Sequence, residues 1–381
     1  MEELFILGNP RFLSGGAAAS CVIDYGMPPP TVESLHCGKV TSESVLSPAH
    51  RGKSLAARVS ACGQQVHSGK SGYHHRPRFN VFLHDGENPT AGVELETESR
   101  VTTAEYVIRL VEDLKSNWFH MERDGSLDPD HGGEYGFEFI TEPLPPRVYR
   151  NPMTWAGLQN VLSPWVESYS KARCGLHVHV GLQQFEKVDG IPLMSPQDRR
   201  RVGKYLSAFV YYCLLNPSFV DRVVLRKNGT WSGVVDSPSL MAFTGLVSGG
   251  KATGGDVVDI VVKNVVAESW AAEAHRASRR VGVETDCNDS TRTYTYDIDS
   301  FAGHGHELNC EHDYTVEFRR GKGTLNSISV HRTVELMTMI VRYAWKIARN
   351  PDMPVSSGDI YRFIAEHTTS PALADLARKE I

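Results

Sequence analysis

The chain has 381 residues, of which 41% are hydrophobic and 22% are charged. This composition excludes a fibrous or fully disordered protein and is typical of a globular protein with a sizeable core. The formal net charge of −5 is too acidic for bulk electrostatics to hold the chain on nucleic acid, so we do not expect nucleic acid as a partner. The sequence contains no run of about 18 apolar residues, so we expect no membrane partner either.

The seven cysteines lie far apart in the sequence, and none forms a Cys-x-x-Cys pair. We interpret them as reduced thiols rather than as ligands of a zinc ribbon. The sequence begins Met1-Glu2-Glu3-Leu4, which is acidic where a secretory signal would be basic. We therefore expect a cytoplasmic protein.

Regular patterns begin only at about residue 90. Residues 1–85 show little periodicity and contain breakers such as Pro28-Pro29-Pro30, which predicts an N-terminal arm of unknown function. Residues 86–350 form the predicted main domain, and 351–381 a helical tail packed on it. The predicted strands are 92–97, 135–144, 176–180 and 314–319. The predicted helices are 102–118, 154–172, 195–215, 257–279, 327–349 and one or two short ones in 357–380. We expect Pro164 to interrupt or kink the helix 154–172.

Glutamates on the first predicted strand are the earliest sign of chemistry. Glu94 and Glu96 are two residues apart, so on a strand they point to one face with their side chains about 7 Å apart. Two carboxylates this close repel in a dry site unless cations lie between them. The alternative is an ordinary solvent-facing side of an antiparallel strand.

Three further strands carry charged or ligating side chains. Glu138 lies in Phe137-Glu138-Phe139-Ile140, where a lone carboxylate is costly unless it is paired or metal-bound. His177 and His179 share a strand face, an arrangement found in metal sites and also in hydrogen-bonded sheet histidines. Glu317 and Arg319 share a face as well, which fits either an ion pair or a metal ligand beside a phosphate clamp.

The order of these motifs resembles the amidoligase family. The motifs are Gly92-x-Glu94-x-Glu96, Asp124-Gly125-Ser126, Glu138-Phe139-Ile140-Thr141, Gly175-Leu176-His177-Val178-His179 and Glu317-Phe318-Arg319. That family is related to glutamine synthetase and γ-glutamylcysteine ligase, which join a carboxylate to an amine with ATP. The resemblance covers residues 90–345. It implies an α+β fold with a curved, mainly antiparallel sheet that forms a catalytic funnel, with helices on its outer face.

The resemblance also implies two metal ions. Glu94, His177 and Glu317 would hold the ion associated with the transferred phosphoryl group. Glu96 and Glu138 would hold the second ion. Its third carboxylate would be Glu134 or, instead, Asp130.

Three other residues receive roles from the resemblance. His179 would lie beside the nucleotide phosphates, and Arg319 would contact the γ-phosphate or the acyl phosphate. Asp124 would shape a turn or touch the incoming amine.

A ligand set rich in carboxylate oxygens suits Mg²⁺ or Mn²⁺ better than zinc. A carboxylate does not react with amines directly, so ATP would first convert it to an acyl phosphate, which the amine then attacks to form an amide or isopeptide bond. We therefore expect an ATP-dependent carbon–nitrogen ligase. Its acid and amine, small molecule or peptide, and its oligomeric state are left open.

Two other activities compete with ligation. One is a zinc hydrolase that uses His177-x-His179 together with a second cluster, formed by His304, His306, Glu307, Cys310 and His312. The other is a phosphotransferase that acts on a guanidino group with the same fold.

Overall fold

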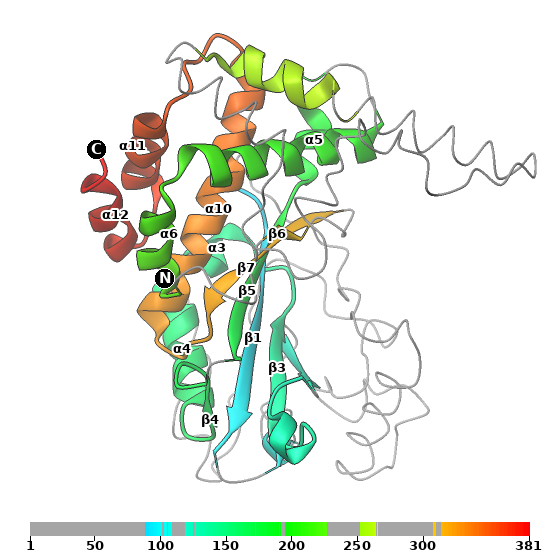
Figure 1. Cartoon of the computed structure of the whole chain (residues 1–381), viewed down its shortest axis with the longest axis vertical. Helices are drawn as coiled ribbons and strands as arrows, with labels where there is room; N and C mark the ends of the chain where they lie inside the picture. Colours follow the sequence, from blue (N-terminus) through cyan, green and yellow to red (C-terminus); the bar gives the residue numbers. More distant parts are fainter. Residues whose placement is uncertain are drawn as a thin grey trace, which may run out of the picture. The chain divides into compact units, whose positions relative to one another are not determined.

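The fold is known from a computed structural model, shown in Figure 1. It describes residues 88–100, 103–108 except 105, 119–226 except 125, 172, 190 and 192–194, 252–265 except 264, 308–309 and 314–381. The predicted arm, most of the predicted helix 102–118 and the second half of the predicted helix 257–279 lie outside these residues.

The strands form one mainly antiparallel sheet. They are β1 (Ala91–Ser99), β2 (Phe119–Arg123), β3 (Gly136–Thr141), β4 (Val166–Glu167), β5 (Gly175–Gly181), β6 (Leu308–Asn309) and β7 (Thr315–Lys322). Their order is β2-β3-β1-β5-β7-β6, and the short β4 pairs with the end of β1. In Figure 1, β1 lies between β3 and β5 accordingly.

Helices make up most of the remaining described structure. They are α3 (Pro146–Tyr149), α4 (Pro152–Leu162), α5 (Pro196–Phe209), α6 (Pro217–Val224), α10 (Ser327–Arg349), α11 (Ser357–His367) and α12 (Pro371–Arg378). The short 3₁₀ helices η4 (Pro129–His131) and η5 (Gln183–Lys187) and the π-helical segment η6 (Val210–Leu214) complete the set, together with helical residues 254–263. No helix in this part of the chain is long and apolar enough to cross a membrane.

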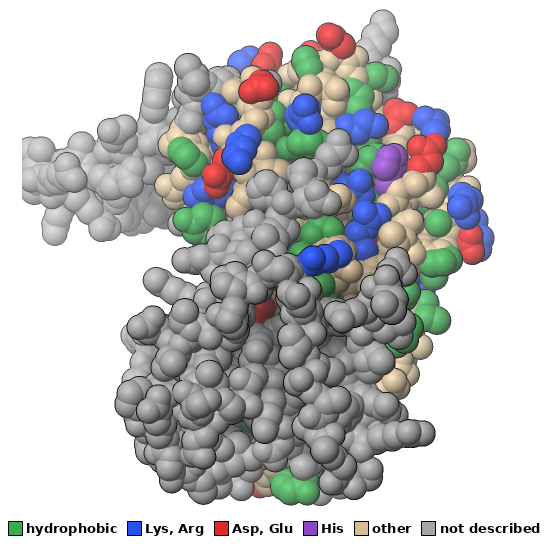
Figure 2. Space-filling model, turned by 180° about the vertical axis from the view of Figure 1, so that it is seen from behind, with side chains coloured by type: hydrophobic (Ala, Val, Ile, Leu, Met, Phe, Trp, Pro, Cys, Tyr) green, Lys and Arg blue, Asp and Glu red, His purple; other side chains and the backbone are tan. Residues whose placement is uncertain are grey.

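Contacts within the chain divide it into two compact units. The first comprises Thr90–Val178 and Gly321–Glu335 among the described residues, and in it α3 packs on α4. The second comprises the described residues of His84–Pro89, His179–Arg320 and Leu336–Ile381, and in it α12 contacts both α6 and α11, while α5 contacts η5. In Figure 2, acidic and basic side chains are intermingled over the upper part of the face shown.

Strand β1 separates a core face from a chemical face. Val93, Leu95 and Thr97 are buried, whereas the alternate residues Glu94 and Glu96 are half-buried. Buried and half-buried residues therefore alternate with a period of two. This alternation favours a strand, because a strand directs every second side chain to the core. The same alternation places both glutamates on the opposite side.

Glycine permits the close approach of β7 to β5. A Cβ atom added at Gly321 would lie 2.3 Å from the backbone oxygen of Leu176, closer than any real Cβ contact. A side chain at this position would push the strands apart, so the missing Cβ sets their spacing.

Most predicted elements are confirmed. The four predicted strands are present, the helix 327–349 matches α10, and the tail contains α11 and α12. Within the predicted helix 154–172, the interruption expected at Pro164 is confirmed, because α4 ends at Leu162. The helix predicted after that proline was wrong, since Val166–Glu167 pairs with β1 as β4. The helix predicted over 195–215 is α5 continued by η6.

The predicted α+β class with a mainly antiparallel sheet is confirmed. The described strands form a sheet that is neither strongly curled nor closed, so the funnel is not seen in them. The predicted domain boundaries stay predictions.

A buried polar cluster lies in the first half of α10, within the first unit. Glu335 is fully buried, and its Oε1 lies 3.4 Å from Nε of Arg150. His331, one turn earlier, is also buried, and this burial lowers the pKa of its imidazole, which favours the neutral ring. The cluster therefore contains one buried carboxylate whose charge is balanced by an arginine.

We expect Glu335→Leu to lower the free energy of unfolding by about 3 kcal/mol, because it leaves the Arg150 charge without its buried partner. The double variant Arg150→Met/Glu335→Leu should recover most of the loss. Urea denaturation of the three proteins measures this. A double variant no more stable than Glu335→Leu would show that the ion pair is not the source of the effect.

Candidate metal centre

A row of carboxylates crosses three neighbouring strands of the sheet. In the register of β1 and β3, Glu96 lies directly opposite Glu138, and in the register of β3 and β2, Glu138 lies opposite Glu122. Directly opposed side chains on antiparallel strands have Cβ atoms about 5 Å apart, where like charges destabilise a sheet. This row therefore requires compensation by cations or by protons.

Three of the acidic side chains in this region meet closely enough to share one ion. Carboxylate oxygens of Glu96, Asp124 and Glu138 all lie within 4.8 Å of one another. Two negative charges at this separation repel by about 3 kcal/mol at an effective dielectric constant of about 20. We call Glu96, Asp124 and Glu138 the carboxylate group.

Local backbone structure holds two members of the carboxylate group in place. Asp124 directly follows β2, and its side chain accepts hydrogen bonds from the backbone N–H of Ser126 at 2.8 Å and from the Ser126 hydroxyl at 2.9 Å. The backbone N–H of Gly175 donates to Oε2 of Glu96 at 2.5 Å. Each carboxylate oxygen still has a second lone pair, so these hydrogen bonds orient the carboxylates and leave each oxygen able to bind a metal ion.

The electrostatics of Glu138 reflect this crowding. Burial raises the pKa of its carboxyl well above the ordinary value, and the charges of Glu94, Asp124, Glu96 and Glu122 raise that pKa further. Without cations, Glu138 therefore holds a proton more tightly than a free glutamate does. A divalent ion would replace that proton.

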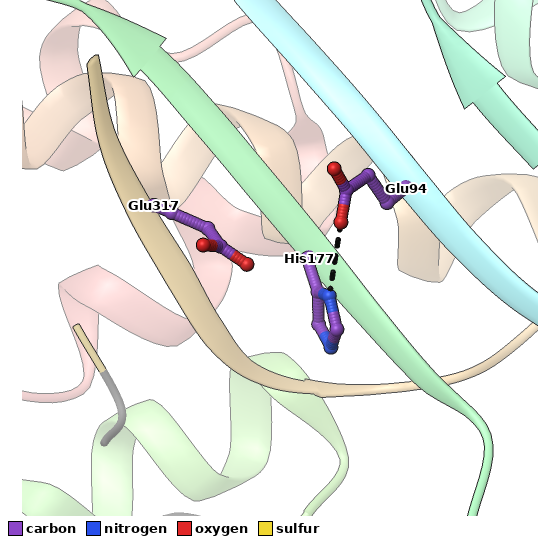
Figure 3. Close-up of side chains that lie close together, drawn as sticks. All are labelled: Glu94, His177 and Glu317. Carbon is purple, nitrogen blue, oxygen red and sulfur yellow. Dashed lines mark hydrogen bonds and ion pairs between the residues drawn. The ribbon is translucent and has the colours of Figure 1, made fainter. Parts of the chain in front are cut away.

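A second set of ligating side chains contains the predicted histidine. Figure 3 shows Glu94, His177 and Glu317 on β1, β5 and β7, which we call the histidine group. Nδ1 of His177 lies 3.3 Å from Oε2 of Glu94, and one ligand atom from each of the three residues lies within 4.8 Å of the others. His177 also approaches the carboxylate group, since its Nε2 lies 3.6 Å from Oε1 of Glu96.

On β7, Glu317 is also tied to a cation. Its carboxylate is almost fully buried and accepts a 3.0 Å hydrogen bond from Nη1 of Arg319. Nε2 of His179 lies 3.9 Å from the same oxygen of Glu317. About a quarter of the Arg319 side chain is exposed, so its guanidinium can reach a bound anion while it orients Glu317.

The structure thus brings together most of the predicted site residues. It places Glu94 with His177 and Glu317, and Glu96 with Glu138, as the sequence motifs indicated. The third member of the carboxylate group is Asp124 rather than Glu134 or Asp130. Glu134 and Asp130 are both exposed and belong to neither group, because they lie in the turn region before β3 begins at Gly136.

Sequence reasoning missed Glu122. This side chain is 8% exposed and lies opposite Glu138 on β2, a strand that was not predicted. The sequence feature that could have identified Glu122 is the spacing Glu122-x-Asp124, which resembles the Glu-x-Glu pattern of β1. The competing cluster of His304, His306, Glu307, Cys310 and His312 lies outside the described residues.

Comparison with protein-family models and with curated proteins found no match.

Replacing Glu138 tests the charge repulsion directly. Because the folded-state pKa of Glu138 is raised, the metal-free protein should lose stability as the pH rises from about 4.5 through that folded-state pKa. We therefore expect Glu138→Gln to raise the melting temperature of the metal-free protein at neutral pH, with no gain at pH 4. Mg²⁺ should stabilise the wild-type protein more than the variant. Thermal unfolding with and without EDTA checks both; a metal-free variant less stable than the wild type would contradict the repulsion.

Adding a methyl group at Gly175 tests the geometry of the two groups. Its Cβ would lie 3.0 Å from Nε2 of His177 and 3.1 Å from Oε2 of Glu96. We expect Gly175→Ala to weaken Mn²⁺ binding at least tenfold, as measured by calorimetry. The matched control is Gly358→Ala in α11, whose Cβ would meet nothing nearer than 3.9 Å and which should bind Mn²⁺ like the wild type. Unchanged binding by Gly175→Ala would mean that the ions, if bound, lie elsewhere.

Proposed function

We propose that the protein is an ATP- and Mg²⁺-dependent carboxylate–amine ligase with a glutamine synthetase-like catalytic sheet. The observation that carries this proposal is the pair of three-residue ligand groups on neighbouring strands, one all-carboxylate and one with a single histidine. A pair of divalent ions is the usual means of neutralising both sides of a transferred phosphoryl group. The order of the motifs in the sequence supports the same class.

The donor sets fit the ions that this reaction needs. Oxygen ligands provide the whole carboxylate group and two thirds of the histidine group, which suits Mg²⁺ or Mn²⁺. When bound, such ions would neutralise the phosphates of ATP and the charge that develops on the moving phosphoryl group. The raised pKa of Glu138 is a further sign that the carboxylate group is arranged for a cation.

The chain's own residues have separate roles in this proposal. Arg319, held by Glu317, stabilises the equatorial oxygens of the γ-phosphoryl group as it moves to the substrate carboxylate. The γ-phosphorus–oxygen bond of ATP breaks, ADP leaves, and the acyl phosphate forms. His179, whose Nε2 lies 3.9 Å from Oε1 of Glu317, would donate a hydrogen bond to the nucleotide phosphates.

The second half of the reaction is attack by the amine on the acyl carbon. The nitrogen must lose a proton, phosphate leaves, and an amide or isopeptide bond results. We assign Asp124 to the second metal rather than to the amine, because its oxygens lie with those of Glu96 and Glu138.

We expect Glu317→Gln to reduce ADP release at least a hundredfold, because it removes a charged ligand and the partner of Arg319. The matched control is Glu366→Gln, which changes an exposed glutamate of α11. The measurement is ADP release during a screen of acids and amines, with products identified by mass. Full turnover by Glu317→Gln would contradict the assignment.

The same screen separates ligation from phosphotransfer, and a metal assay of the purified protein tests the zinc alternative. A new amide in the product supports ligation, whereas a stable phosphorylated guanidino product would replace ligation by phosphotransfer. Stoichiometric zinc that survives dialysis, with no nucleotide binding, would replace both by zinc hydrolysis.

A further inference from the structure

The segment that joins β4 to β5 is bound at both ends to Glu96. We call residues 168–175 the clamp segment, and the structure describes all of them except 172. At its start, the buried hydroxyl of Ser168 donates to the backbone oxygen of Glu96 at 2.7 Å. At its end, the N–H of Gly175 donates to Oε2 of the same glutamate at 2.5 Å. The clamp segment therefore contacts both the backbone and the carboxylate of one member of the carboxylate group.

Lys171 attaches the middle of the clamp segment to the same strand. Its Nζ lies 2.8 Å from Oε2 of Glu98, whose side chain is only 12% exposed. Glu98 is two residues from Glu96 on β1, so both side chains lie on one face of the strand. The hydrogen bond to Glu98 is the main cause that raises the pKa of the Lys171 ammonium. A charge-assisted hydrogen bond thus links the clamp segment to β1 beside Glu96.

Residues at the end of β7 hold the clamp segment from a second direction. Nζ of Lys322 donates to the backbone oxygen of Lys171 at 3.1 Å, and the N–H of Gly323 donates to the oxygen of Cys174 at 3.1 Å. A Cβ atom added at Gly323 would lie 2.4 Å from Oγ of Ser168, so the two chain segments are in close contact. The ammonium of Lys171 is therefore presented to Glu98 by a backbone that is itself anchored.

We propose that Lys171 is a positioning residue of the carboxylate group. Its ion pair with Glu98 holds the clamp segment on β1, and the clamp segment holds the N–H of Gly175 on the carboxylate of Glu96. Lys171 itself contacts neither the ions nor the substrates. This inference rests on the proposed function, in which Glu96 is a ligand of the second ion.

The charge of Lys171 acts in the opposite direction to its positioning role. A lysine ammonium repels a bound divalent ion, so the loss of that charge alone strengthens metal binding. Loss of the ion pair, by contrast, releases the clamp segment and leaves the carboxylate of Glu96 less well oriented, which weakens metal binding. The sign of the change in metal affinity therefore separates the two effects.

The substitution Lys171→Met tests the positioning role, with Mn²⁺ as the probe and calorimetry as the measurement. In about 0.5 M KCl, long-range charge effects are largely screened. We expect the variant to bind Mn²⁺ about threefold more weakly than the wild type, because the ion pair is partly exposed. Lys171→Arg keeps the charge and the hydrogen bond, so it should recover most of the affinity.

The matched control is Arg173→Met. Arg173 is an exposed cation of the clamp segment, and it makes no ion pair with any residue that the structure describes. Its replacement removes the same charge two residues from Lys171 and leaves the attachment to Glu98 in place. This control should bind Mn²⁺ as tightly as the wild type or slightly more tightly.

Hydrogen exchange of the Gly175 amide gives a second readout in the metal-free protein. This N–H is protected by its hydrogen bond to Glu96. We expect it to exchange faster in Lys171→Met than in the wild type, and at the wild-type rate in Arg173→Met.

The outcomes are distinct. Unchanged or tighter Mn²⁺ binding by Lys171→Met overturns the role of Lys171 and leaves the ligase proposal intact. An equal loss of affinity in Arg173→Met, or no recovery in Lys171→Arg, also overturns it. If the wild-type protein binds no Mn²⁺, the proposed function fails together with this inference.

Discussion

Repulsion between carboxylates on one face of a sheet is the constraint on which the candidate site depends. Glu138 lies between Glu96 and Glu122 in the strand register, and Asp124 joins Glu96 and Glu138 within 4.8 Å. Hydrophobic residues on the other face of β1 fix these positions, since a slip of one residue would bury the acids in the core. The core therefore holds together charges that would separate in a flexible chain, and this stored repulsion favours cation binding.

His177 links the two ligand groups. One ring nitrogen approaches Glu94 and the other approaches Glu96, so the orientation of the imidazole is coupled to both carboxylates. Gly175 makes this contact possible, because it leaves room for the ring and donates its N–H to Glu96. On β7 the pair Glu317 and Arg319 places a positive charge beside the ligands.

The parts of the site that lie on strands were predictable, because a period of two fixes the face of each side chain. Glu94, Glu96, Glu138, His177 and Glu317 were found in this way. The role of Asp124 as the third carboxylate was not predicted. Its side chain reaches the carboxylate group because a turn follows β2 and because β2 pairs with β3, and no local sequence pattern encodes that pairing. Pro164 indicated the interruption after α4, whereas the pairing of β4 with β1 that follows it has no local sequence pattern.

The central claim is that the carboxylates and His177 form two adjacent divalent-ion sites for a nucleotide-dependent reaction. The most direct measurement is to count bound Mn²⁺ by electron paramagnetic resonance in the presence of a non-hydrolysable ATP analogue. We expect two ions per chain, with magnetic coupling between them, and loss of that coupling in Glu96→Gln. Absence of bound Mn²⁺, or a coupled pair that persists in Glu96→Gln, would contradict the claim.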